Sequence, residues 1–187
     1  MKTKLIFLLL SLAGIISFSS CEKKNFNEMP PETQTGANTL GCLIDGKLFV
    51  GGCCAPWMQS DIAIGGEYHS ISKKLYFGAY GKIDNKAAGN IYMEIDTPQE
   101  NSTQKFTEAR YGPSSDLRPQ ISTGSCLTLS TVNDGTCIIT KFDTIKKIVS
   151  GRFEFIGRCT SDYPDSTTVT KQITQGRFDL KFDISNQ

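Results

Sequence analysis

Very few side chains in this sequence could serve as nucleophiles or general bases. The chain has 187 residues and a single histidine, His69, so a Ser-His-Asp triad could be assembled only around that imidazole. No serine lies in a G-x-S-x-G elbow, the turn that presents a nucleophile above a sheet. His69 is read more simply as a polar residue at a strand end. No catalytic residue is predicted.

Paired carboxylates could instead support sugar hydrolysis. Glu154 and Asp179 are examples, but both alternate with apolar residues, and each follows an arginine by two positions, Arg152 and Arg177. This pattern predicts solvated carboxylates that pair with arginines across strands. A hydrolase acting on glycans therefore remains the alternative hypothesis.

The seven cysteines offer disulfide or metal chemistry. One of them, Cys21, lies near the N-terminus, and the other six form an even set that allows up to three disulfide bonds. These candidates are Cys42, Cys53, Cys54, Cys126, Cys137 and Cys159. Their spacings lack the two-residue gaps that are typical of zinc sites, so no metal and no other cofactor is predicted.

Aromatic residues suggest a binding surface. Trp57 follows two cysteines, an alanine and a proline, in an apolar stretch that reads as a loop. Aromatic rings of this kind stack on sugars or meet protein partners. The candidate surface comprises Trp57, Tyr68, His69, Tyr76 and Tyr80. The alternative, that Trp57 plugs one end of the fold and the tyrosines cover edges, stays open.

The N-terminus reads as an export signal. Two lysines in the first four residues precede an apolar run, Leu5 to Ile16, which is shorter than the roughly 20 residues that a membrane span needs. The block Phe18-Ser19-Ser20-Cys21 resembles a lipobox. We therefore expect residues 1–20 to be a lipoprotein signal peptide and Cys21 to carry acyl chains such as palmitate. An ordinary secretory signal, with Cys21 as a normal thiol, is the alternative.

The remainder divides into a tether and one domain. Residues 22–38 are polar, contain Pro30-Pro31 and show no apolar period. Together with the lipidated cysteine they predict a tether over residues 21–38, extended or disordered, with nothing to bury. Residues 39–187 have a length that suits a single all-β domain.

Alternation of apolar and polar residues dominates this domain. Phe178, Leu180, Phe182 and Ile184 share one face of a predicted strand, and the charged residues between them share the other. Two further runs alternate in the same way, around residues 91–95 and 149–155, and Gly-rich or Asp-rich turns such as Gly65-Gly66 separate the strands. The pattern predicts an antiparallel β-sandwich or a partly open β-barrel.

Three passages carry a family resemblance. They are Thr35 to Lys47, Ile139 to Asp143 leading into Ile148 to Phe155, and Ile173 to Asp179, and they resemble a Bacteroidetes-type family of exported lipoproteins of unknown function. The resemblance implies an all-β exported domain and an outer-membrane address. It implies no activity.

We therefore expect an outer-membrane lipoprotein of the cell envelope that acts as a binding or interaction module, with a glycan-directed hydrolase as the alternative. Its expected partners are the lipid bilayer, through the acyl chains on Cys21, and a glycan or a protein. The formal net charge of +1 gives no electrostatic reason to expect nucleic acid.

Overall fold

The computed structural model describes residues 25–53, 63–113, 120–121, 124–125, 128–132, 134–160 and 168–186. Within these ranges the chain forms strands, turns and irregular segments, without any helix, and so without one that could cross a membrane. The predicted signal peptide, Cys21 and Trp57 lie outside the described residues.

The described part of the chain contains 13 strands. They are β1 (Thr39–Ile44), β2 (Lys47–Gly51), β3 (Ile64–His69), β4 (Lys74–Ile83), β5 (Lys86–Asp96), β6 (Ser102–Gln104), β7 (Glu108–Pro113), β8 (Gln120–Ile121), β9 (Gly124–Ser125), β10 (Leu129–Val132), β11 (Thr136–Asp143), β12 (Ile148–Thr160) and β13 (Thr168–Ser185).

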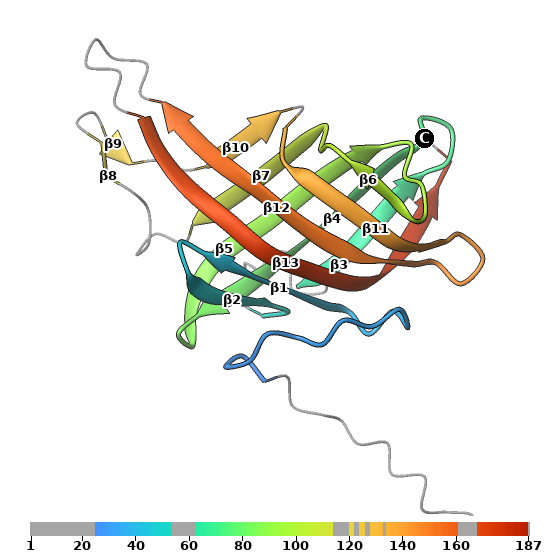
Figure 1. The fold of residues 1–187 in the computed structure, drawn as a ribbon, viewed down its shortest axis with the longest axis horizontal. Helices are drawn as coiled ribbons and strands as arrows, with labels where there is room; N and C mark the ends of the chain where they lie inside the picture. The colour runs from blue at the N-terminus through green and yellow to red at the C-terminus, as the bar shows by residue number, and fades with distance from the viewer. Residues whose placement is uncertain are drawn as a thin grey trace, which may run out of the picture.

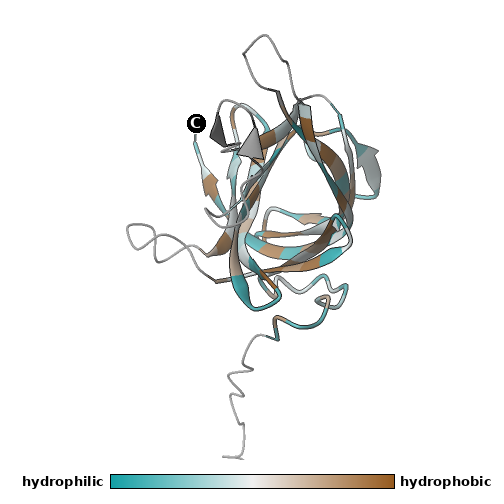
Figure 2. Ribbon diagram, turned by 90° about the vertical axis from the view of Figure 1, so that its left-hand side faces the viewer, coloured by the Kyte–Doolittle hydropathy of each residue, from teal (hydrophilic) through white to brown (hydrophobic). Residues whose placement is uncertain are grey.

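Eleven of these strands form one sheet that curls into a partly closed ring (Figures 1 and 2). The order is β2-β1-β13-β3-β4-β5-β7-β10-β12-β11-β6, and the pairings β13–β12 and β2–β4 bring the sheet back on itself. Between β13 and β4 the wall has two parts, because β3 pairs with one end of both strands and the β1–β2 hairpin pairs with the other. The predicted all-β fold is confirmed, as a single curled sheet rather than a regular barrel.

The interior of the ring is a packed apolar core. The predicted inward positions of β13, Phe178, Leu180 and Phe182, are all buried, and Phe178 lies 4.6 Å from Phe77 across the core, measured between ring centroids. Ile184, predicted on the same face, is 38% exposed where β13 leaves the core. The other two alternating runs also point inward at the predicted positions, since Met93 and Phe155 are buried. Local alternation therefore identified most of the core.

Tight turns join the paired strands. Asp45 and Gly46 both adopt positive φ between β1 and β2, and Asp84 and Asn85 do so between β4 and β5, as type I′ hairpins require. The prediction that Gly65-Gly66 forms a turn is wrong, because both residues lie within β3. Glycine pairs occur both in turns and within strands. Here Gly65 and Gly66 pair with residues of β4 and therefore belong to a strand.

The segment before β1 is docked on the outside of the ring, and we call residues 25–38 the strap (Figure 1). Its Phe26 ring lies 4.7 Å below Lys82 Nζ on β4, and its Pro30 is buried. Pro30 packs against Gly41 on β1, where a side-chain carbon added to the glycine would lie only 2.4 Å from the proline ring. The strap is irregular, as a tether should be, but the expectation that it buries nothing is wrong.

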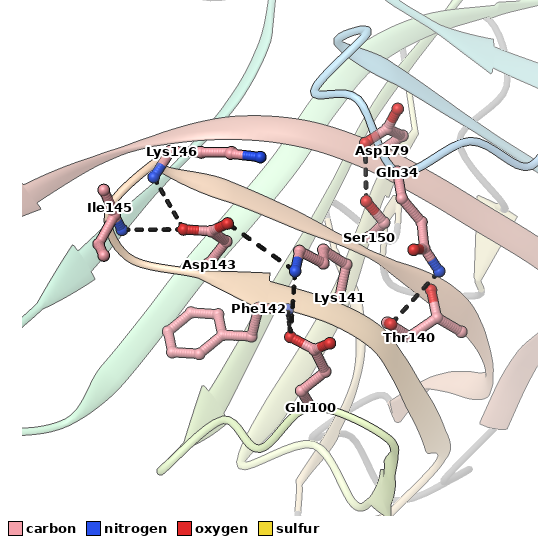
Figure 3. A network of polar contacts seen from close by, with 10 residues as sticks. All are labelled: Gln34, Glu100, Thr140, Lys141, Phe142, Asp143, Ile145, Lys146, Ser150 and Asp179. Atoms are coloured by element: carbon pink, nitrogen blue, oxygen red, sulfur yellow. Dashed lines mark hydrogen bonds and ion pairs between the residues drawn. The ribbon is translucent and has the colours of Figure 1, made fainter.

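One carboxylate holds the end of the strap. Asp179 accepts six hydrogen bonds, from Thr33 Oγ1, Thr35 N and Oγ1, Gly36 N, Ala37 N and Ser150 Oγ, over 2.5–3.2 Å. Figure 3 shows Ser150 beside Asp179, and Gln34 of the strap donating to the Thr140 carbonyl. Asp179 is 1% exposed, so the prediction that it is a solvated partner of Arg177 is wrong.

The pKa of Asp179 reflects these contacts. Desolvation by burial raises it, but hydrogen bonds from Thr33, Ser150, Ala37 and Gly36 outweigh that effect and lower the pKa to about 2. The carboxylate is therefore ionised throughout the physiological range and stabilises the docked strap.

The cysteines divide into two groups. Cys42 and Cys137 are free thiols buried in the core, and burial raises the pKa of both. The expectation of disulfide bonds is wrong for these two, because each faces inward on its strand and packs as a small apolar residue. Cys53 and Cys159 are disulfide-bonded. Cys54 and Cys126 lie outside the described residues.

Candidate functional site: a tyrosine groove on the outer face

A groove of about 550 Å³ crosses the outer face of β3, β4 and β5. Its floor is made of small residues, chiefly Gly65, Gly66 and Gly78, and its walls are aromatic. The sheet register explains this arrangement, because Gly65 on β3 pairs with Gly78 on β4, and Gly78 pairs with Tyr92 on β5. Side chains at paired positions project from the same face of a sheet, so two glycines in a row leave a trough beside the tyrosine.

Gly78 is also required by the backbone. A side-chain carbon built there would lie 2.1 Å from the Ile91 carbonyl oxygen of the adjacent strand. No larger residue fits at this point unless β4 and β5 separate. The groove is therefore deep at Gly78 because the pairing of β4 with β5 leaves no room for a side chain there.

Aromatic rings line the groove. Tyr76 and Tyr92 stack with their ring centroids 6.3 Å apart and an interplanar angle of 29°. His69 lies against the other side of Tyr76, at 4.6 Å between centroids, and the Arg110 guanidinium lies 5.5 Å from the centroid of the Tyr92 ring. These neighbours hold the two tyrosine rings in place, so the groove has a preformed aromatic wall.

The charges around the wall are largely neutralised within the sheet. Lys74 Nζ lies 2.7 Å from Glu94 Oε1 and 3.4 Å from Asp96 Oδ1, and Arg110 pairs with Glu108. Burial, followed by the nearby carboxylate of Glu94, raises the pKa of Tyr92 to about 12. Tyr92 therefore remains a neutral phenol that can donate or accept a hydrogen bond at any physiological pH.

Several polar groups of the groove are left without internal partners. Within the described ranges, neither the Asn90 amide nor the Asp183 carboxylate makes a hydrogen bond or ion pair, and the same holds for the hydroxyl groups of Tyr76 and Tyr92. Asp183 comes from β13, where it pairs with Glu67 on β3. These groups supply donors and acceptors around an apolar trough, the usual composition of a small-ligand site.

Tyr80 lines the groove, and its backbone contacts the residues on either side of positions 54–62. The Tyr80 carbonyl accepts hydrogen bonds from Gly52 N at 2.7 Å and Cys53 N at 3.2 Å, and its N–H donates to the Ala63 carbonyl at 2.9 Å. The described residues on either side of positions 54–62 therefore both contact Tyr80. Trp57 itself lies outside the described residues.

The structure brings together three of the residues predicted for a binding surface: His69, Tyr76 and Tyr80. Tyr68 does not belong to it, because it is only 9% exposed and packs edge-on against Phe142 in the core, at 5.2 Å between centroids. Because two glycines precede it in β3, the sequence shows no alternation from which the inward direction of the Tyr68 side chain could be predicted.

Sequence reasoning missed Tyr92, Asn90 and Asp183 as members of the groove. Tyr92 could have been found, since it alternates with the buried residues Ile91 and Met93 and must point outward. Asn90 and Asp183 carry no local signal, because only the sheet register places them beside the tyrosines.

Comparison of this chain with protein family models, with curated protein sequences and with solved structures finds no significant match in any of the three.

Proposed function

We propose that this protein is an exported lipoprotein, anchored in the outer membrane by acyl chains on Cys21, and that it binds an uncharged oligosaccharide in the tyrosine groove. The observation that carries the binding proposal is the pair of stacked rings, Tyr76 and Tyr92, on an open sheet face beside polar groups that have no partner among the described residues. The anchor rests on the succession of charged, apolar and small residues that ends at Cys21.

The chemistry of the groove favours a sugar. Tyrosine rings offer flat apolar faces to the C–H groups of a pyranose, while Asn90, Asp183 and the phenols can bond its hydroxyl groups. An anionic ligand is disfavoured, because Glu67 and Asp183 line the groove and the nearby cations Lys74 and Arg110 are already paired with carboxylates.

A glycan-directed hydrolase is the second candidate function. The observation that favours it is the adjacency of two carboxylates, Glu67 and Asp183, at one side of the groove. One of the two is engaged, since Glu67 Oε1 lies 3.3 Å from His69 Nε2. The open form of the groove is better suited to holding a chain than to excluding water from a cleavage site.

The binding proposal is tested by exposing the full chain to an immobilised panel of neutral and acidic oligosaccharides. We expect binding to neutral members, and a loss of at least about tenfold in affinity when Tyr76→Ala or Tyr92→Ala removes a stacking face. Ile145→Ala, at the exposed tip of the β11–β12 hairpin, is the control and should bind as the parent does. Absence of binding across the panel, or binding that both tyrosine variants retain, would reject the proposal.

The same experiment separates binding from hydrolysis. Bound oligosaccharides are recovered after prolonged incubation, and their reducing ends are counted. New reducing ends that disappear in Glu67→Gln and Asp183→Asn would establish the hydrolase instead.

The anchor is tested by fractionation. Replacing Cys21 with alanine should move the protein from the membrane fraction to the soluble fraction, because acyl chains on that residue would supply the attachment. Unchanged membrane partition of the variant would defeat the lipoprotein proposal without affecting the groove.

A further inference from the structure

A second hollow lies on the outer face of β11, β12 and β13, beside the strap, with a volume of about 390 Å³. Two arginines line it, Arg152 on β12 and Arg177 on β13, and they are direct partners in the sheet register. Like charges at directly opposed positions destabilise a sheet unless an anion lies between or above them. The hollow therefore holds two adjacent positive charges, and the carboxylates of Glu32 and Glu154 also line it.

The strap supplies an anion to one of the two arginines. Glu32 accepts from Arg152 Nε at 3.0 and 3.1 Å and from Arg152 Nη2 at 2.7 Å, the geometry of a forked guanidinium–carboxylate pair. The hydrogen bond from Arg152 lowers the pKa of Glu32. Both side chains remain open to solvent, with Glu32 43% and Arg152 60% exposed, so a pair of this kind is weak and can exchange with other anions.

The second arginine is not satisfied. Arg177 Nη1 donates to the Pro30 carbonyl at 3.3 Å, but its Nε is buried and has no hydrogen-bond partner among the described residues. A buried charged donor without a partner is costly, and in native proteins such a group usually marks a ligand, a bound ion or a functional site. The strap thus gives Arg152 a carboxylate and gives Arg177 only a backbone carbonyl.

We propose that Arg152 and Arg177 form an oxyanion-binding site, separate from the tyrosine groove, which takes a single carboxylate or phosphate group, and that Glu32 occupies part of it when no ligand is present. Two guanidinium groups side by side present enough donors to hold one such group from both sides. The strap stays docked during the exchange, because the hydrogen bonds to Asp179 do not involve Glu32.

The charged residues around the hollow limit the net charge of the ligand. Glu154 also lines the hollow and has no ion-pair partner among the described residues. With Glu32 displaced, the two arginines and Glu154 leave one net positive charge, which suits a monoanion and disfavours a polyanion. Ile138, which is 38% exposed, lines the same hollow and would meet an apolar part of the ligand.

The test uses inorganic phosphate and acetate as probes, titrated separately into the ¹⁵N-labelled full chain. The Nε–Hε signals of Arg152 and Arg177 are recorded by NMR and assigned with the two Arg→Lys variants. We expect both signals to shift in a saturable manner. Glu32→Gln should bind about two- to threefold more tightly, because it removes a weak internal competitor and keeps the side-chain shape.

Matched variants make the result specific. Arg177→Lys should lose most of the binding, whereas Arg158→Lys, which changes an arginine of the same strand as Arg152 outside the hollow, should bind as the parent does. Dihexanoyl phosphatidylglycerol below its micelle concentration distinguishes the sources of the phosphate: equal affinity indicates a free anion, and tighter binding indicates a lipid headgroup.

The proposal is overturned if neither arginine signal saturates with either probe, or if Glu32→Gln binds no more tightly than the parent. It is also overturned if Arg177→Lys retains full binding. None of these results bears on the tyrosine groove, whose residues are unchanged in every variant.

Discussion

The face under the strap and the face that carries the tyrosine groove differ in how their polar side chains are hydrogen-bonded. Under the strap, Asp179 is buried and receives six hydrogen bonds from the chain itself. In the groove, Asn90 and Asp183 lie beside apolar rings and, within the described part of the chain, find no internal partner. The contrast separates polar groups that maintain the fold from polar groups that are free to meet a ligand.

This distinction has an energetic basis. A partnered buried carboxylate contributes to folding, and its removal leaves several donors without an acceptor. A solvent-facing carboxylate or amide beside a groove costs little when it is changed, so stability alone does not explain its presence. Mutations should therefore affect stability on the first face and binding on the second.

The largest loss of stability is expected from the inward neighbour of Asp179. Phe178→Ala should lower the free energy of unfolding by about 3–5 kcal/mol, because the ring is buried against Phe77 and Phe153 and its removal leaves a cavity. Urea denaturation measures the change. A loss below about 0.5 kcal/mol, the scale of surface substitutions, would contradict the packing described for β13.

Asp179→Ala should cost about 2–4 kcal/mol, since the donors of Thr33, Gly36, Ala37 and Ser150 lose their acceptor. The strap should also become sensitive to protease, which the time course of limited proteolysis would detect. Asp183→Asn is the control on the other face, and it should change neither stability nor cleavage. Equal behaviour of the two variants would remove the contrast between the faces.

Acid should weaken the same contact. The folded-state pKa of Asp179, about 2, lies below the unfolded value near 4, so its contribution is present above about pH 4 and is lost as the pH falls through about 2. The contribution is at most about 2.5 kcal/mol. Unfolding of the parent and of Asp179→Asn is compared between pH 5 and pH 2. The difference between them should shrink on acidification, and a constant difference would contradict the assigned pKa.

Tyr76→Ala should cost only about 0.5–1 kcal/mol of stability, the worth of its stacking with Tyr92 and His69, while oligosaccharide binding falls by the larger factor given above. Thermal unfolding and binding are measured on the same sample. A destabilisation above about 2 kcal/mol would place Tyr76 with the structural residues.

The smallest effect is expected at Glu32. Glu32→Gln should change the free energy of unfolding by no more than about 0.5 kcal/mol, because its ion pair with Arg152 is exposed. Urea denaturation of the parent and of Glu32→Gln, at low and at high salt, measures this change. A larger loss that persists at high salt would show that this pair belongs to the structural contacts of the strap.

How far the sequence predicted these features depends on how far apart the interacting residues lie along the chain. Phe178, Leu180 and Phe182 were predicted to face the core, because alternation is a local property of one strand. The burial of Asp179 could not be predicted, because its partners on the strap lie more than 140 positions away and contain no apolar signal.

The candidate site shows the same limit. Tyr76 and Tyr80 alternate with the buried residues Phe77 and Ala79, so their outward direction was accessible to sequence reasoning. The trough between the tyrosines depends on the pairing of Gly65 with Gly78, and two glycines in different strands are indistinguishable from two glycines in turns until the register is known. The free thiols of Cys42 and Cys137 likewise depend on which positions face the core.

The docked strap has a consequence for the geometry of the protein at a membrane. If Cys21 carries the anchor, as we propose, a free tether up to residue 38 would let the domain move as far as roughly 55 Å from the bilayer. The contacts of the strap begin at Phe26, which leaves four residues between the anchor and the first docked residue, or five steps along the chain and roughly 17 Å when extended. The protein would then sit close to the lipid surface with a restricted tilt, so that the direction in which the groove opens is set by the fold rather than by diffusion about a long linker.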